Sequence, residues 1–342
     1  MITTMLAVRG RRLGRHAAAW GCAALATVTV LGPAPAQARA AATVPPGRVW
    51  ASFAFYPPLN QLVLFGGNSG STIYADTWTR TGSSTWARQH PALSPSARTG
   101  AGLVYDPATQ QLLLFGGGTT PSGPFNGDTW TWTGTTWARL HPATSPPGRE
   151  FGDLVYDAAT KTVVLFAGWH GSYLDDTWSW NGTTWTHLRP ATSPSGRDSD
   201  AFVYDPATGT AIMFGGFRGT GYVPGDTWSW NGTTWTQLNP PTSPGTDVFA
   251  WQGAYDAASH QLLLFGGDRG KTKPSLDGTW EWTGTTWTQL SPATSPPGRG
   301  YGTMTYDAAT KQVVLTAGRS TGTTITYPTT TWSWNGSTWA QI

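Results

Sequence analysis

The sequence predicts an all-β fold, a six-bladed β-propeller of four-stranded antiparallel blades. A unit of about fifty residues recurs six times, and its aromatic anchors lie 48 to 51 residues apart. These anchors are Phe55, Tyr105, Tyr156, Tyr204, Tyr255 and Tyr306. A repeat of this length is typical of propellers and solenoids. Because each unit shows four short β-type segments and no helical periodicity, a propeller is favoured.

The fourth unit illustrates the four expected strands. Residues 201–204 and 211–214 are apolar segments joined by the tight-turn sequence Asp205-Pro206-Ala207-Thr208. The second segment ends in a double glycine, and a variable loop leads to the third strand, DTWSW. Asn231-Gly232 then predicts a two-residue type I′ hairpin into the fourth strand, TTWTQL.

The stretch DTWSWNGTTW occurs twice without change, at 176–185 and 226–235, and accounts for many of the 21 tryptophans. In a two-residue hairpin, Trp228 lies opposite Trp235, and Trp228 and Trp230 share one face of the strand. Since propeller blades stack face to face, we expect these indoles to pack between blades. The same turn chemistry explains three sequon-like asparagines, Asn181, Asn231 and Asn335.

The repeat divides a single domain at 41–342 into six predicted blades. Their approximate bounds are 46–95, 96–146, 147–194, 195–244, 245–296 and 297–342. The first predicted strand is innermost in blade 1 and the last is outermost in blade 6, so these blades exchange no strand. We therefore expect side-chain packing alone to hold the junction between blades 1 and 6.

Residues 1–40 predict a secretory signal peptide. Four arginines precede a short apolar run at 17–31, and small residues favour cleavage near Ala38 or Ala40. The run is too short for a comfortable membrane span. We expect a secreted protein without a membrane span, exported by either the general or the twin-arginine route.

Removal of the leader changes the charge and the cysteine content. Residues 1–38 carry four Arg and no acid, which leaves 17 basic and 18 acidic side chains, a formal charge of −1. Such a balance argues against nucleic acid as a partner. The single Cys, Cys22, lies in the leader, so the mature chain has no disulfide, thiolate metal site or cysteine nucleophile. We expect a monomer with a large core.

The repeated unit resembles the kelch repeat. It carries a leading Arg, a Tyr-Asp pair, an apolar strand ending in Gly-Gly, and Asp-Thr-Trp before a Trp-x-x-Leu strand. The double glycines are Gly66-Gly67, Gly116-Gly117, Gly215-Gly216 and Gly266-Gly267, with Ala-Gly in the other two blades. The leading arginines are Arg48, Arg98, Arg149, Arg197 and Arg299; blade 5 lacks one. The resemblance implies the fold but no single activity, because kelch propellers include enzymes and binding scaffolds.

Galactose oxidase shares this fold, and the resemblance implies a specific test. Its copper is held by His and Tyr ligands, with one Tyr cross-linked to a Cys. Because the predicted mature chain has no Cys, the resemblance extends to the fold and not to that site. We assign no metal ligand and predict no cofactor.

Acidic residues cluster at the starts of the innermost strands of blades 3 to 5. They are Glu150, Asp153, Asp198, Asp200 and Asp247. Since these strands converge on the central channel, we expect the acids to share one mouth. They are candidate catalytic carboxylates for acid–base work on a sugar, or could hold a divalent cation. Alternatively, they cap loops and bind the neighbouring Arg149 and Arg197.

Aromatic and charged residues outside the repeat lie in loops on the same predicted face. The candidate ligand-binding residues are Trp50, Phe151, Trp169, His170, Phe217, Arg218, Tyr222, Trp251, Asp268, Arg269, Tyr301 and Arg319, with Lys271 and Lys273 in the same class of loop. Flat rings stack well on sugar faces, and the cations could bind carboxylate or phosphate. Alternatively, the rings fill the channel or the blade junctions and the charges are solvated.

The sequence contains no nucleophile elbow, zinc-binding HExxH, P-loop or dinucleotide fingerprint. It favours a secreted binding module whose loop face takes a glycan or an extracellular protein. The alternative is a secreted carbohydrate-active enzyme, a lyase, hydrolase or epimerase, that uses the acids of blades 3 to 5.

Overall fold

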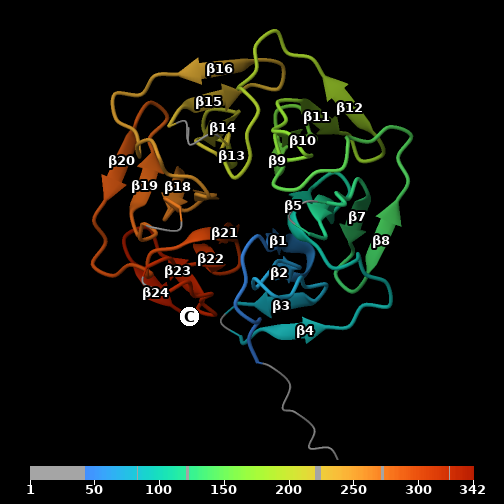
Figure 1. Ribbon diagram of the computed structural model, residues 1–342, viewed down its shortest axis with the longest axis horizontal. Helices are drawn as coiled ribbons and strands as arrows, with labels where there is room; N and C mark the ends of the chain where they lie inside the picture. Colours follow the sequence, from blue (N-terminus) through green and yellow to red (C-terminus); the bar gives the residue numbers. More distant parts are fainter. Residues whose placement is uncertain (1–42, 83, 121–122, 220–224, 271–272, 323) are drawn as a thin grey trace, which may run out of the picture. The chain divides into compact units, whose positions relative to one another are not determined.

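The computed structural model describes residues 43–82, 84–120, 123–219, 225–270, 273–322 and 324–342. Over these residues the chain forms six four-stranded antiparallel sheets, arranged around a centre as the blades of a propeller (Figure 1). The predicted all-β, six-bladed fold is confirmed. The predicted signal peptide lies outside the described residues. In the part of the chain that is described, no helix has the length and apolar character needed to cross a membrane.

Each blade is a meander in which consecutive strands pair from the channel outward. Blade 1 contains β1 (Ser52–Tyr56), the 3-10 helix η1 (Pro57–Leu59), β2 (Gln61–Phe65), β3 (Thr77–Thr81) and β4 (Ala87–Gln89). Blade 2 contains β5 (Thr99–Asp106), β6 (Gln111–Gly118), β7 (Thr129–Trp132) and β8 (Trp137–Leu140). Blade 3 contains β9 (Asp153–Asp157), β10 (Thr162–Phe166), β11 (Thr177–Trp180) and β12 (Trp185–Leu188).

The other three blades repeat the same order. Blade 4 contains β13 (Ala201–Asp205), β14 (Thr210–Phe214), β15 (Thr227–Trp230) and β16 (Trp235–Leu238). Blade 5 contains β17 (Gln252–Asp256), β18 (Gln261–Phe265), β19 (Thr279–Trp282) and β20 (Trp287–Leu290). Blade 6 contains β21 (Gly300–Asp307), β22 (Gln312–Arg319), β23 (Trp332–Trp334) and β24 (Trp339–Gln341).

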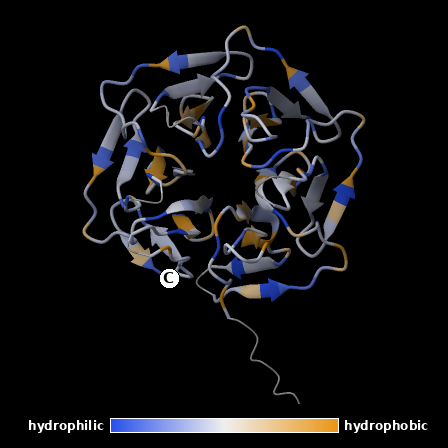
Figure 2. Cartoon of the chain, in the orientation of Figure 1, coloured by the Kyte–Doolittle hydropathy of each residue, from blue (hydrophilic) through white to orange (hydrophobic). Residues whose placement is uncertain are grey.

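The hydrophobic core is divided among the junctions between blades. Six apolar clusters are present, and each combines residues from two neighbouring blades. Apolar residues gather on the inner strands, whereas the outer strands are more hydrophilic (Figure 2). The repeated tryptophans belong to these clusters, so the prediction that they pack between blades is confirmed. Burial of such large rings is a main source of stability for a fold of this kind.

The hairpin between the third and fourth strands differs from the prediction. Its loop spans the four residues 231–234, so that Trp230 and not Trp228 pairs with Trp235. The Asn231 Oδ1 accepts the backbone N–H groups two and three residues further on, at 3.0 and 2.8 Å. These bonds close a wider turn than type I′, so the predicted pairing of Trp228 with Trp235 is wrong. The equivalent asparagines of blades 3 and 6 make the same bonds.

A side-chain hydrogen bond crosses every blade junction. The Trp that begins each fourth strand donates its indole N–H to the Thr beside the third strand of the preceding blade, at 2.9 to 3.2 Å. The pairs are Trp137–Thr77, Trp185–Thr129, Trp235–Thr177, Trp287–Thr227, Trp339–Thr279 and Trp86–Thr331. The last pair joins blade 1 to blade 6 and closes the ring.

Backbone hydrogen bonds also cross the closing junction. The Trp50 N–H donates to the Tyr301 carbonyl at 3.1 Å, and the Gly318 N–H donates to the Arg48 carbonyl at 2.8 Å. The expectation that side-chain packing alone holds this junction is therefore wrong. The bonding groups belong to the repeat itself, so the ring closes without an exchanged strand.

The leading Arg and the Asp of Asp-Thr-Trp form a buried ion pair in four blades. The pairs are Arg48–Asp76, Arg98–Asp128, Arg149–Asp176 and Arg197–Asp226, with N–O distances of 2.5 to 2.7 Å. Each Asp also accepts the indole N–H of the Trp two residues later. The Asp and both tryptophans of DTWSW therefore have structural roles, in the ion pair, the hydrogen bond and the packing between blades.

Candidate functional site

One residue of each blade adopts a left-handed backbone conformation at the channel. It lies two positions after the leading Arg, or after the Val248 that replaces it in blade 5, and its φ is between 53° and 65°. The six residues are Trp50, Gly100, Phe151, Ser199, Ala250 and Tyr301. All six line one cavity of about 200 Å³ at the channel. Because bulky residues rarely adopt this conformation, and strained positions concentrate at functional sites, this ring is the first candidate.

Backbone hydrogen bonds join these positions across five of the six blade junctions; none is found between Phe151 and Ser199. The Gly100 N–H donates to the Trp50 carbonyl at 2.9 Å, and the Phe151 N–H donates to the Gly100 carbonyl at 2.7 Å. On the other side of the channel, the Tyr301 N–H donates to the Ala250 carbonyl at 3.2 Å. These bonds link the backbone segments from which the side chains around the cavity project.

Three aromatic side chains of this ring form one wall of the cavity. The ring centroid of Trp50 lies 4.9 Å from that of Tyr301 and 5.2 Å from that of Phe151. Phe151 reaches over blade 2 because the residue there is a glycine: a Cβ on Gly100 would lie 2.5 Å from Phe151 Cδ1. We call Trp50, Phe151 and Tyr301 the aromatic wall.

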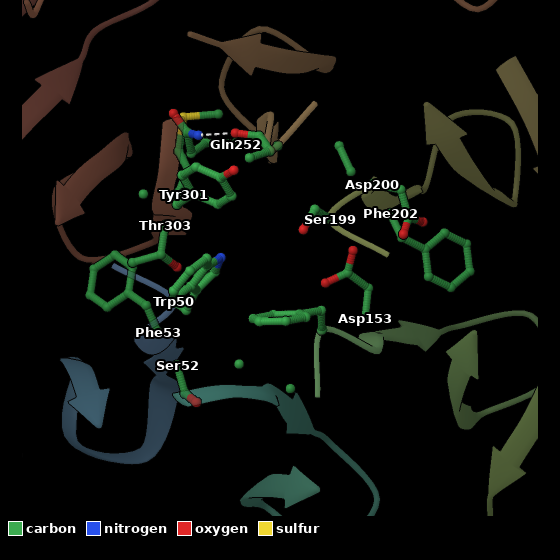
Figure 3. A pocket seen from close by; sticks show the side chains of 18 of the residues that line it. Trp50, Ser52, Phe53, Asp153, Ser199, Asp200, Phe202, Gln252, Tyr301 and Thr303 are labelled. Carbon is green, nitrogen blue, oxygen red and sulfur yellow. Dashed lines mark hydrogen bonds between the residues drawn. The ribbon is translucent and has the colours of Figure 1, made fainter. Parts of the chain in front are cut away.

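The opposite side of the cavity is polar and acidic. Asp153 begins β9, and Ser199 and Asp200 lie directly before β13, so all three come from the adjacent blades 3 and 4. Figure 3 shows Trp50 and Tyr301 on one side of the cavity and Asp153, Ser199 and Asp200 on the other. A ligand in this space would therefore meet apolar rings on one face and carboxyl groups on the opposite edge.

Burial changes the acidity of these carboxyl groups. Burial, with a smaller contribution from the charge of Asp198, raises the pKa of Glu150 to about 7. Burial likewise raises the pKa of Asp198 to about 7, against a hydrogen bond from Ser199. The pKa of Asp153 lies well above its usual range because of burial and the charge of Asp200. Glu150, Asp153, Asp198 and Asp200 thus lie close enough for their charges to interact, but only Asp153 and Asp200 line the cavity.

Asp200 completes this group of carboxyls. Burial raises its pKa to about 7, although the Arg197 guanidinium opposes the shift. The raised pKa values mean that these carboxyl groups keep their protons to a higher pH than exposed acids do. Arg149 and Arg197 form their ion pairs with other carboxylates, Asp176 and Asp226, and so the alternative that the acids simply pair with the leading arginines is not seen.

Asp247 does not join the other acids. It is exposed and is absent from the cavity lining, so the expectation that it shares the mouth is wrong. Blade 5 has Val248 at the position of the leading Arg, and Asp247 precedes that position, whereas the other acids follow it. The aligned position in blade 5 is Phe249.

Several predicted ligand residues form an aromatic band that continues from the wall. The centroid of Trp169 lies 4.6 Å from that of Tyr173, which lies 5.9 Å from Phe217. Phe217 lies 5.1 Å from Phe249, and Phe249 lies 5.9 Å from Tyr301. Tyr173 and Phe249 were not predicted from the sequence, although Tyr173 lies three residues after the predicted His170 and Phe249 lies two residues before the predicted Trp251.

Two predicted charged residues, Asp268 and Arg319, form an ion pair with each other. The Arg319 Nη2 donates to Asp268 Oδ2 at 3.0 Å, and the Asp268 side chain is completely buried. The guanidinium carbon of Arg319 lies 4.6 Å from the centre of the Tyr301 ring. This pair therefore supports the aromatic wall from behind, across the junction of blades 5 and 6.

The remaining predicted residues lie in different surroundings. Trp251 is buried in the junction of blades 4 and 5 and donates its indole N–H to the Val248 carbonyl at 3.1 Å, so it fills a junction as the alternative proposed. The His170 ring lies 5.2 Å from that of Phe125. Half-buried Arg218 and Arg269 follow the double glycines of blades 4 and 5, as predicted. Lys273 is exposed.

Two predicted residues, Tyr222 and Lys271, lie outside the described residues. Sequence reasoning also missed polar residues of the cavity, namely Ser52, Ser199, Gln252 and Thr303. Ser199 could have been found, because it stands at the same repeat position as Trp50, Phe151 and Tyr301.

The carboxyl groups near the cavity were also predicted to be able to hold a divalent cation. Among the described residues, no three His, Cys, Asp or Glu side chains are grouped closely enough to hold a metal ion. The four carboxyls belong to β9 and to the segments before β9 and β13, and they form no such group. A divalent cation at the acidic mouth stays a prediction.

Comparison with known proteins supports the fold. The chain is similar to a solved structure described as the structure of YjhT, with a TM-score of 0.64 and 14% sequence identity. The match covers 88% of this chain and 98% of that one. No family model and no curated protein matches the sequence. At this identity the likeness extends to the β-propeller architecture and carries no activity with it.

Proposed function

We propose that this protein is a secreted, monomeric kelch-type β-propeller that binds a carbohydrate in the cavity at the mouth of its central channel. The observation that carries the proposal is the placement of the aromatic wall opposite Asp153 and Asp200. Export through the segment 1–40, cleaved near Ala38 or Ala40, belongs to the same proposal.

A sugar ring suits this cavity because it has two kinds of surface. One face of a pyranose presents mainly C–H groups, which pack against aromatic rings, and its edge presents hydroxyl groups. Carboxylates accept hydrogen bonds from such hydroxyls, and protonated carboxyls donate to them. A mixture of both protonation states, together with Ser199, therefore matches the edge of a sugar. Small-ligand sites are typically concave, with apolar walls and a few convergent polar groups.

A protein partner fits this geometry less well. Stable protein interfaces bury about 800 Å² on each partner, whereas the distinctive residues here line a small, open cavity of about 200 Å³. We therefore favour the carbohydrate over the extracellular protein.

A second candidate function is a carbohydrate-active enzyme, and the acidity of the mouth favours it. Glu150, Asp198 and Asp200 all have a pKa raised to about 7. Groups with such values exchange protons readily at neutral pH, which suits general acids and bases in lyases, hydrolases or epimerases. Loss of turnover with retained binding in Asp200→Asn would favour the enzyme; full turnover in that variant would exclude this acid as the catalytic group.

The binding proposal is tested by a glycan panel followed by calorimetry on wild type and two tryptophan variants. Trp50→Ala removes the centre of the aromatic wall and should weaken binding by about tenfold, which corresponds to about 1.4 kcal/mol. Trp280→Ala is the matched control, because Trp280 is also half-buried but lines a groove between blades 4 and 5. Unchanged affinity in Trp50→Ala, or a loss confined to Trp280→Ala, would show that the cavity is not the site.

A further inference from the structure

On the acidic side of the cavity several carboxyl groups are buried together, and the charge of Arg197 offsets the burial of Asp200 only in part. Glu150 is 1% exposed, Asp200 is 5% exposed and Asp198 is 8% exposed. The guanidinium groups nearest in sequence, Arg149 and Arg197, are each held in a two-point bond by another carboxylate. Buried ionised groups are costly unless they are paired and hydrogen-bonded.

Asp200 shows the deficit most clearly. Among the described residues, neither of its carboxylate oxygens has a hydrogen-bond partner, and Glu150 Oε2 has none either. Unsatisfied buried polar atoms in native structures call for a specific explanation, and an absent ligand is one. Asp200 lines the cavity together with Asp153, and both of its carboxylate oxygens are buried. The charge of Asp200 raises the pKa of Asp153, so the two carboxyl groups lie close to each other.

We propose that the cavity is selective for an amino sugar, whose ammonium group binds between Asp153 and Asp200 while its ring packs on the aromatic wall. This inference rests on the proposed function, because it names the class of carbohydrate that the same cavity takes. The ammonium donates hydrogen bonds to the carboxylates and adds a positive charge beside them. A cation close to Trp50, Phe151 and Tyr301 is attracted further by the faces of the rings.

An ammonium group fits the arrangement of the acids better than a metal ion does. A divalent cation such as Ca²⁺ takes six to eight oxygen ligands that converge on one point. No such group of carboxylates is present among the described residues. An ammonium needs only two or three acceptors, which Asp153, Asp200 and Ser199 provide from one side of the cavity.

The test compares sugars that differ only in the amine. Glucosamine, galactosamine and mannosamine are titrated calorimetrically at pH 6.5, each beside its parent hexose and its N-acetyl derivative, in chelator-treated buffer. We expect at least one amino sugar to bind about tenfold or more tightly than both neutral counterparts. Asp153→Asn should remove this advantage and leave the affinity for the parent hexose within about twofold. Asp175→Asn, which alters an exposed carboxylate in a loop of blade 3, is the matched control.

The outcomes separate the inference from the proposed function. Equal affinity for amino and neutral sugars overturns the inference and leaves the carbohydrate site intact. Binding of Ca²⁺ at the mouth in place of the amine also overturns it. If no sugar of any series binds and the glycan panel is blank, the proposed function fails as well. Thermal unfolding of Asp153→Asn verifies its fold, and Asp200→Asn serves as the second variant if the first is unstable.

Discussion

Replacing Thr330 by Asp should stabilise the propeller. In four blades the leading Arg binds an Asp at this position, but in blade 6 the residue is Thr330. Arg299 Nη2 donates to Thr330 Oγ1 at 3.3 Å, and the Trp332 indole donates to the same oxygen at 3.2 Å. Arg299 is completely buried, so it carries a charge without the carboxylate that its equivalents have.

The size of the effect follows from the pKa of Arg299. Burial lowers this pKa from 12.5 to about 10. Each unit corresponds to 1.36 kcal/mol, so burial of the charge costs the folded state about 3 kcal/mol at every pH below about 10. Part of any gain is offset by desolvation of the new carboxylate. We therefore expect Thr330→Asp to raise the free energy of unfolding by about 1 to 2 kcal/mol.

Urea denaturation and calorimetry would measure this gain against Thr330→Asn, which has the same shape without the charge. The Tm should rise by a few degrees, since about 1 kcal/mol shifts Tm by roughly 2 to 4 °C in domains somewhat smaller than this one. In the other blades burial opposes the shift, but the Arg lowers the pKa of the equivalent Asp below 3.8. The gain should therefore be complete at pH 7 and disappear only below about pH 4.

Two results would refute this reasoning. Thr330→Asp could be no more stable than Thr330→Asn, which would mean that the guanidinium is already compensated. Alternatively, Thr330→Asp could be destabilised at pH 7 and recover on acidification, which would mean that desolvation of the carboxylate exceeds the attraction to Arg299.

Three further predictions concern the ring and its mouth. Thr331→Val removes the oxygen that accepts the indole N–H of Trp86 at the closing junction, and it should lower the free energy of unfolding by about 1 to 3 kcal/mol. Thr227→Val at an internal junction should lower it by the same amount. A much smaller loss for Thr331→Val in urea denaturation would contradict the equivalence of the junctions. The folded-state pKa of Asp198 is raised, so its ionisation destabilises the fold as pH rises from about 4 to about 7. Asp198→Asn should thus increase stability by up to about 4 kcal/mol at pH 8 and by little at pH 4, and a pH-independent effect would argue against this assignment. Gly100→Ala should lower the free energy of unfolding by about 1 to 3 kcal/mol and weaken sugar binding, because the φ of Gly100 is 65° and an added Cβ would meet Phe151. Unchanged affinity would show that Phe151 does not contribute to the site.

The repeat made the architecture predictable from sequence alone. The period, the turn residues and the apolar segments agree with one another in every unit, so errors in one unit are corrected by the others. The loop from Asn231 to Thr234 escaped prediction because Asn-Gly is compatible with more than one hairpin. The side-chain oxygen of Asn231 decides between them by accepting two backbone N–H groups.

The candidate site was predictable only in part. Acids and aromatics that interrupt the repeat pointed to Glu150, Asp200 and Trp50, and these do line or adjoin the mouth. The left-handed conformation at the channel was not predictable, since residues such as Trp50 and Phe151 do not favour it. Backbone hydrogen bonds between neighbouring blades accompany this conformation, and such contacts between blades leave no mark on any single unit.

A crystal structure of the protein with the tightest-binding sugar of the panel tests the central claim most directly. The account predicts a single sugar in the channel cavity, with its apolar face against Trp50 and its polar edge toward Asp153 and Asp200. A sugar bound instead in the groove beside Trp280, with the channel cavity filled only by water, would contradict it.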